Sequence, residues 1–136
     1  MWIGGTDDKS GAGHERGPYW LNGLVPLVAI LNVSSPTKLQ VDVAAQVDRW
    51  VTFILDTQNA TGWLGSDDGF GGAGNDYWNA WNVVASLLQY ADAKPGTPIA
   101  ARCQKAVLAY IAEASRRMKD VPLAAWSQNR WQDWVF

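Results

Sequence analysis

The sequence has few of the residues on which metal sites and nucleophilic catalysis depend. Its 136 residues include one cysteine, Cys103, and one histidine, His14. A single cysteine excludes a disulfide within the chain and a metal site built from several thiolates. Cys103 shares one face of a predicted helix with Ile99 and Val107, so we interpret it as a buried small hydrophobic side chain.

An excess of charge of either sign is also lacking. The chain has 11 Lys and Arg against 13 Asp and Glu, a formal net charge of -2. No basic stripe alternates with aromatic residues, so the electrostatic signature of nucleic-acid binding is missing. We therefore expect no nucleic-acid partner.

Long apolar runs are missing as well. No run approaches the roughly 18 residues that cross a membrane, and the first residues lack the basic and apolar regions of a signal peptide. We expect a soluble chain without a membrane partner. Two sequons, Asn32-Val33-Ser34 and Asn59-Ala60-Thr61, would suit glycosylation in a secreted protein.

Tryptophan, by contrast, is abundant. The chain has 9 Trp, with 4 Tyr and 3 Phe. Large, flat, amphipathic side chains either fill a core or line a pocket for a ligand with a flat apolar face and a polar rim. A sugar ring is a ligand of this kind.

Apolar residues recur at three- and four-residue steps in several segments. This periodicity predicts helices over 18–32, 36–57, 76–94 and 97–118, and a fifth helix that begins at 126.

Local signals refine these helix boundaries. Ser34 to Pro36 suits the start of the second helix, and Asn75 or Asp76 suits the N-cap of the third. Gly23 and Pro26 inside the first helix favour a helix that is surrounded on all sides.

The starts of the odd-numbered helices resemble one another. Trp20, Trp78 and Trp131 recur at intervals of roughly 55 residues, the length of one two-helix unit with its loops. The odd helices are aromatic and the even ones amphipathic, which predicts an inner and an outer layer. We therefore expect an all-α fold of two helical hairpins plus a stub, an arc of an (α/α)6 six-hairpin toroid. Residues 1–136 would form part of one larger barrel domain, with the flanks of the first and fifth helices exposed.

In such an arc, the starts of the inner helices converge at one end of the barrel. Tyr19 and the residues around these starts combine indole rings with carboxylate, amide and guanidinium groups, the mixture that binds sugars. The candidate carbohydrate-binding residues are His14, Glu15, Trp20, Asn22, Asp76, Trp78, Asn79, Trp81, Trp126, Arg130, Trp131 and Asp133.

Each of these candidates has a structural alternative. His14 could be solvated, Glu15 could interact with a helix dipole, and Asp76 could be only an N-cap. The tryptophan pairs could belong to the core, and Arg130 with Asp133 could form a surface ion pair. No catalytic residue is assigned, although Glu15 is a candidate for acid–base work. No metal site is expected, since Asp67, Asp68, Asn75 and Asp76 lack EF-hand spacing and acidic residues are few.

Several motifs together resemble the β-L-arabinofuranosidase-like glycoside hydrolases, in particular glycoside hydrolase family 127 and its relatives. The resemblance runs through nearly the whole chain. The motifs are the stretch from His14 to Leu27, Ile54 to Gln58, Gly62 to Gly65, Leu87 to Tyr90, Trp126 to Ser127 and Arg130 to Asp133.

The resemblance implies a six-hairpin barrel of which this chain is the first part, a secreted location, and action on plant or microbial glycans. Characterised members hold a cysteine nucleophile on zinc through further cysteines and a glutamate. Cys103 has no such companions here, so no cofactor is expected in this chain, and zinc would belong to the full-length parent. The chain would position carbohydrate, be inactive alone, and pack against the remaining hairpins of the parent barrel.

Two alternatives remain open from the sequence. The stretch from Phe53 to Trp63 resembles the Gln-Trp repeat of triterpene cyclases, in which a glutamine caps a helix and a tryptophan stacks on it. Gly62 and Trp63 are adjacent here, whereas the repeat separates them by one residue, and no acidic cyclisation motif is present. The other alternative is a carbohydrate-binding or degenerate fragment without activity.

Overall fold

A computed structural model describes residues 16–32, 34–65, 77–121, 123 and 125–135, and these residues contain helices and no strand. The all-α fold predicted from the sequence is therefore confirmed for this part of the chain. The elements are α1 (Gly17–Ile30), α2 (Lys38–Thr57), α3 (Trp78–Ala93), α4 (Pro98–Asp120), α5 (Ala125–Asn129) and the short 3-10 helix η3 (Trp131–Trp134).

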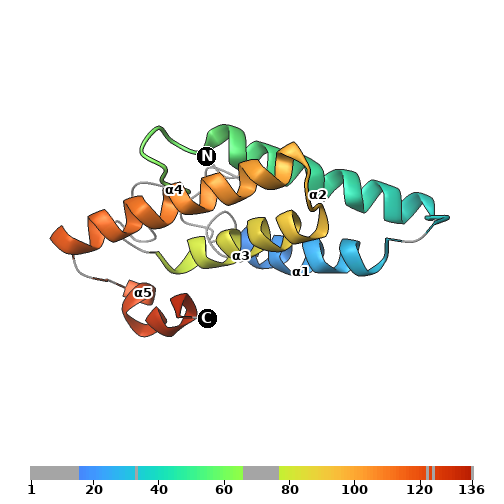
Figure 1. Ribbon diagram of the computed structural model, residues 1–136. Coiled ribbons are helices and arrows are strands. Elements are labelled where there is room, and N and C mark those ends of the chain that lie inside the picture. The colour runs from blue at the N-terminus through green and yellow to red at the C-terminus, as the bar shows by residue number, and fades with distance from the viewer. Residues whose placement is uncertain (1–15, 33, 66–76, 122, 124, 136) are drawn as a thin grey trace.

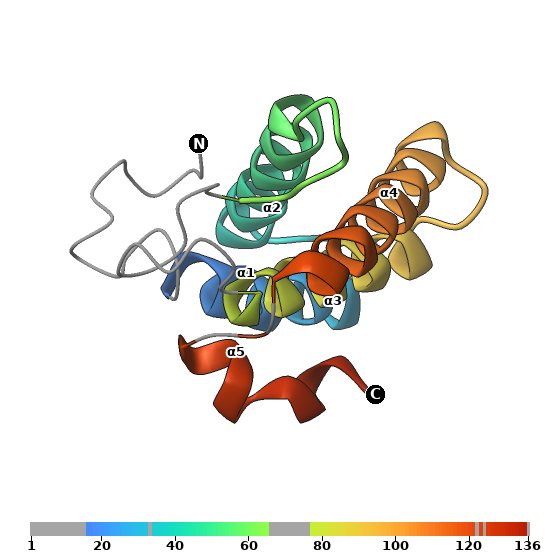
Figure 2. The ribbon, with the colours of Figure 1, turned by 90° about the vertical axis from the view of Figure 1, so that its left-hand side faces the viewer.

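The four long helices form two layers. α1 and α3 lie side by side and run in the same direction, and α2 and α4 cover one side of them in the reverse direction (Figure 1). The short C-terminal helices lie on the opposite side of α1 and α3 (Figure 2). The contact between α1 and α3 is the most extensive one, whereas α2 and α4 touch little. That these two hairpins belong to a six-hairpin toroid stays a prediction.

The starts of α2 and α4 are explained by their capping residues. Thr37 and Gln40 form a capping box: the Gln40 N–H donates to Thr37 Oγ1 (3.3 Å), and the Thr37 N–H donates to Gln40 Oε1 (2.7 Å). The helix therefore begins at Lys38, not at the expected position 36. In α4, Thr97 Oγ1 accepts from the Ala100 N–H (3.3 Å) and Pro98 occupies the first turn.

The C-terminal segment differs from the single helix expected from position 126. α5 is only five residues long. Arg130 then adopts φ -126° and ψ 26°, which interrupts the helical hydrogen bonding, and η3 follows as a separate turn. The chain direction therefore changes at Arg130.

The core lies between α3 and the two helices that flank it. Leu21 and Val25 of α1, Leu87 of α3, and Cys103 and Tyr110 of α4 are all buried. The prediction of a buried cysteine is confirmed, and burial raises the pKa of the Cys103 thiol to about 11.

α1 is not surrounded on all sides, contrary to the expectation drawn from Gly23 and Pro26. Leu27 and Ile30 are 47% and 78% exposed. Among the described elements, only α2 and α3 make substantial contact with α1, so Leu27 and Ile30 lie on an exposed side of this helix.

The segment that follows α2 links α2 to α4. Gln58 Nε2 donates to the carbonyl oxygens of Gly62 (2.6 Å) and Ala106 (2.8 Å), the latter in the middle of α4. Trp63 is buried against Tyr110 (5.1 Å between ring centroids) and beneath the guanidinium of Arg117 (4.1 Å). This arrangement differs from the cyclase repeat because the glutamine binds mid-helix and the tryptophan stacks on an arginine.

Candidate functional site

Three segments far apart in the sequence meet at the start of α3. The rings of Tyr19 and Trp78 lie 6.0 Å apart between centroids, and the guanidinium carbon of Arg130 lies 5.5 Å from the Trp78 ring. We call Tyr19, Trp78 and Arg130 the helix-start cluster. A cation over an indole face is an attractive electrostatic contact, so Arg130 is oriented by Trp78.

A hydrogen bond fixes the third segment in place. The backbone N–H of Trp78, the first residue of α3, donates to Ser127 Oγ of α5 (2.9 Å). The first four N–H groups of a helix have no partner within it, and the N-cap residue Tyr77 supplies no side-chain hydrogen bond. Ser127 therefore supplies a side-chain acceptor at the start of α3. Asn75 and Asp76, the residues expected to cap this helix, lie outside the described residues.

The exposed members of the cluster differ from its buried member. Trp78 is 7% exposed, whereas Tyr19 is 42% exposed and Trp131, beside Arg130 in sequence, is 56% exposed. Trp78 therefore supports the cluster, and its exposed members are Tyr19 and Arg130; Trp131 is a further exposed aromatic side chain next to Arg130 in the sequence.

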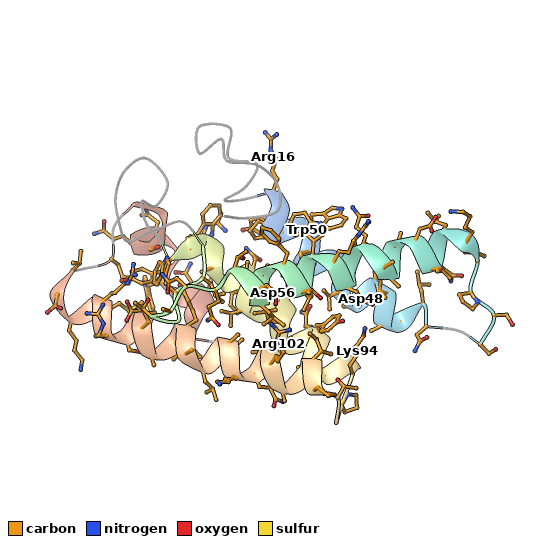
Figure 3. The ribbon with its side chains drawn as sticks, turned by 90° about the horizontal axis from the view of Figure 1, so that it is seen from above. Arg16, Asp48, Trp50, Asp56, Lys94 and Arg102 are labelled. Atoms are coloured by element: carbon orange, nitrogen blue, oxygen red, sulfur yellow. The ribbon has the colours of Figure 1, made fainter. Side chains whose placement is uncertain are left out.

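Trp20 takes a different direction from Tyr19. Its ring packs against Trp50 of α2, with 5.2 Å between centroids, and it remains 40% exposed. Trp50 lies on the side of α2 opposite Asp48 and Asp56 (Figure 3). The two aromatic pairs thus flank the start of α1 on different sides.

A pair of amides lies one helical turn beyond these aromatics. Asn22 Nδ2 of α1 donates to Asn82 Oδ1 of α3 (3.3 Å), and Asn82 is 1% exposed. Among the described residues, Asn22 Oδ1 and Asn82 Nδ2 have no further hydrogen bond. The pair ties the two inner helices together by a polar contact within an apolar interface.

The structure brings together only some of the sequence candidates. Trp78 and Arg130 are in contact, while Asn22 and Trp20 contact Asn82 and Trp50, which were not among the candidates. Trp131 is exposed, and Trp81 and Asp133 are half-buried. His14, Glu15 and Asp76 lie outside the described residues, and the side chains of Asn79 and Trp126 do too.

Sequence reasoning missed Asn82, Trp50 and Ser127. A signal was present for Asn82, because an asparagine within an otherwise apolar helix face needs a partner. Trp50 was assigned to the buried face of its helix, and nothing in its neighbourhood indicated an aromatic partner on α1. The residues around Ser127 do not indicate its role, because that role depends on α5 folding back against the start of α3.

A buried carboxylate lies in the C-terminal half of α4, where it is held by two arginines. Glu113 accepts from Arg116 Nε (2.8 Å) and Nη2 (2.9 Å) and from Arg117 Nε (2.8 Å). These hydrogen bonds, from Arg116 first and then Arg117, lower the pKa of Glu113 to about 2. A carboxylate held ionised in this way is structural and has no use as a general acid near neutral pH.

The described residues also form an aliphatic groove, which we call the α1–α2 groove. It has a volume of about 590 Å³ and lies between α1, the first half of α2 and the end of α3. Small-molecule sites commonly occupy 300 to 1,000 Å³. Its walls include Leu24, Val28, Leu31, Val43, Ala44 and Val47.

One end of the α1–α2 groove is polar. Asp48 Oδ1 accepts from Tyr90 Oη (2.7 Å) and from Lys94 Nζ (2.7 Å), and Lys94 Nζ also donates to Tyr90 Oη (2.8 Å). Figure 3 shows Asp48 extending from α2 toward Lys94. We call Asp48, Tyr90 and Lys94 the polar triad.

The charges of the polar triad stabilise each other. Burial raises the pKa of Asp48, but the hydrogen bonds from Lys94 and Tyr90 outweigh it, so this pKa lies below its usual value. Burial lowers the pKa of Lys94, and its bonds to Asp48 and Tyr90 raise it above the usual value. Both groups are therefore ionised near neutral pH, and the triad has no net charge.

Metal and membrane features were sought over the same residues. Within the described ranges, no group of three His, Cys, Asp or Glu side chains is placed to hold a metal ion. Of the described helices, none combines the length and apolar character required to cross a bilayer.

Comparison of the chain with protein-family models, with characterised proteins and with solved structures found no match in any of the three. The functional argument therefore depends on the residues themselves.

Proposed function

We propose that the chain is a segment of a carbohydrate-active helical barrel, of the glycoside hydrolase kind, and that the starts of its inner helices position a sugar. The observation that carries this proposal is the helix-start cluster. Tyr19, Trp78 and Arg130 come from three different segments, and Trp78 contacts both of the others at one end of α1 and α3.

The chemistry of the exposed side chains supports a neutral, hydroxyl-rich ligand. Tyr19 and Trp131 offer flat apolar faces for a sugar ring. Arg130 offers several N–H donors in a fixed plane for hydroxyl oxygens. Trp78 supports the cluster from below, and its backbone is held by Ser127.

In this proposal the chain binds carbohydrate but does not hydrolyse it by itself. Glu113, which interacts electrostatically with Tyr77 beside Trp78, is held ionised by Arg116 and Arg117 and is not assigned a catalytic role. Glu15, which precedes the described residues, is the acid–base candidate, and any zinc-bound nucleophile would belong to the longer parent protein. Its further hairpins would cover the exposed flank of α1 that includes Ile30.

The test is a titration of the chain with neutral arabino- and xylo-oligosaccharides, in which binding is measured by isothermal titration calorimetry. Replacing Trp131 with alanine is expected to weaken binding at least about tenfold, because stacking on an exposed aromatic face is lost. Leu108→Ala removes an equally exposed apolar side chain from the outer face of α4 and is the control.

Two results would count against the proposal. One is the absence of binding to any neutral oligosaccharide, and the other is an equal loss in both variants. Binding without cleavage of aryl arabinofuranosides agrees with a positioning segment. Cleavage by the isolated chain would show instead that the reacting groups lie within it.

A further inference from the structure

The α1–α2 groove differs in chemistry from the helix-start cluster. Its walls are aliphatic, and Tyr90 at the polar end is its only aromatic lining residue. Leu39 and Val41 on the rim are 71% and 52% exposed. Covering such side chains with an aliphatic chain is favourable, because it removes apolar surface from water.

The polar triad leaves one donor and one acceptor unused among the described residues. The Lys94 ammonium has three N–H groups, of which Asp48 and Tyr90 take two. Both hydrogen bonds that Asp48 accepts end on Oδ1, so Oδ2 keeps its capacity as an acceptor. A hydroxyl group can satisfy both positions, because it accepts one hydrogen bond and donates another.

A charged head group fits the polar triad less well. A carboxylate would lie beside the ionised Asp48, and an ammonium would lie beside Lys94. In either case a like charge within a few ångströms offsets the attraction of the other partner. The Asp48 and Lys94 charges already neutralise each other at 2.7 Å.

We propose that the α1–α2 groove binds an uncharged amphiphile, a single aliphatic chain with a hydroxyl head. The chain lies along the aliphatic walls, and the hydroxyl accepts from Lys94 Nζ and donates to Asp48 Oδ2. The inference is independent of the carbohydrate proposal, since the groove shares no residue with the helix-start cluster.

The first experiment compares three probes of equal chain length, 1-octanol, octanoate and octylammonium. Each is added as a monomer to the full chain, and binding is followed by the methyl signals of leucine and valine in NMR spectra. Octanol is expected to bind at least tenfold more tightly than either charged probe and to shift the signals of Leu24, Val28 and Val43. A charged probe that binds as tightly as octanol would overturn the proposal.

The second experiment fills the groove. Ala45 lines it but is exposed, so Ala45→Phe is expected to weaken octanol binding at least tenfold without disturbing the core. Ala101→Phe makes the same change at an exposed position of α4 outside the groove and is expected to stay within twofold. If Ala45→Phe does not fold, Ala93→Phe fills the groove from α3. Equal effects of the filling and control variants would overturn the proposal.

The third experiment changes the charge of the polar triad. Asp48→Asn removes the negative charge that repels a carboxylate, so the affinity for octanoate is expected to rise at least tenfold and the affinity for octanol to change less. A larger change in the affinity for octanol than for octanoate would refute the assigned head group. Sedimentation of the wild-type chain tests whether a second copy of the chain occupies the groove instead. A wild-type dimer that dissociates in the Ala45→Phe variant would show that a second copy covers the groove, and would overturn the proposal.

Discussion

The backbone N–H of Trp78 donates to the side-chain hydroxyl of Ser127, 2.9 Å away and 49 residues later in the sequence. The first residue of α3 thus has a side-chain hydrogen-bond partner on a different helix. This bond holds α5 against the inner layer and places Arg130 over the Trp78 ring.

Replacing Ser127 with alanine is expected to destabilise the fold by about 1 to 3 kcal/mol, because a buried N–H loses a hydrogen-bond partner. Chemical denaturation gives the free energy of unfolding. Ser115→Ala, at an exposed position of α4, is the control and should change it by less than about 0.5 kcal/mol. Equal changes in both variants would show that the Ser127 bond contributes nothing.

Two glycines are expected to respond in opposite ways to the same substitution. Gly62 has φ +97°, and a Cβ there would lie 2.7 Å from the Ala109 carbonyl oxygen, so Gly62→Ala should destabilise the fold by more than about 1 kcal/mol. Gly23 lies inside α1 with nothing within 4 Å of its Cβ position, so Gly23→Ala should stabilise it by about 0.5 to 1 kcal/mol. Thermal unfolding of both variants tests the pair. A stabilised Gly62→Ala would contradict the assigned backbone.

The contribution of Glu113 to stability should disappear at acid pH. Its pKa falls from 4.5 to about 2 on folding, through the hydrogen bonds from Arg116 and then Arg117. A carboxyl group with a lowered folded pKa stabilises the protein above its unfolded pKa, and this contribution disappears as the pH falls through the folded value. The wild-type chain should therefore lose stability between about pH 4.5 and pH 2.

Glu113→Gln should lower stability near neutral pH and flatten the pH dependence over the same acid range. The measurement is the denaturant midpoint as a function of pH. Asp92→Asn removes an exposed carboxylate of α3 and is the matched control. If Glu113→Gln loses as much stability at acid pH as the wild-type chain, other carboxylates cause that loss of stability.

Cys103 should be inert in the folded chain. Burial raises its pKa from 9.0 to about 11, which reduces the thiolate fraction about 100-fold near neutral pH, and the side chain has no access to solvent. A thiol reagent added at pH 8 should react slowly with the native chain and at once in denaturant. Fast reaction under native conditions would show that α4 opens locally.

The sequence predicted the features that depend on local periodicity. The four long helices, the Pro18 and Thr97-Pro98 starts and the burial of Cys103 all follow from neighbouring residues in the chain. The alternation of aromatic and amphipathic helices also agrees with the two layers seen (Figure 2).

The features that failed depend on contacts between distant segments. Ser34 to Pro36 looked like a helix start, but the reciprocal bonds of Thr37 and Gln40 satisfy more backbone groups at position 38. The contact of Trp20 with Trp50 of α2 was not predicted either, and Trp20 remains 40% exposed beside it. Spacing along one helix does not determine which neighbour an indole meets, because that depends on how the helices pack.

The seam between α2 and α4 is spanned by polar side chains. Helices α1 and α3 pack directly, whereas α2 joins the second hairpin both through the buried Val47, Val51 and Ile54 and through polar side chains at its exposed edge. Besides the polar triad these are the Asp56 to Arg102 ion pair (2.7 Å), seen in Figure 3, and the Gln58 amide. The buried side of α2 is thus fixed by packing, and its exposed edge is linked by long, half-exposed side chains. Ionic strength, which screens exposed ion pairs, therefore weakens the links at this edge more than it weakens the core.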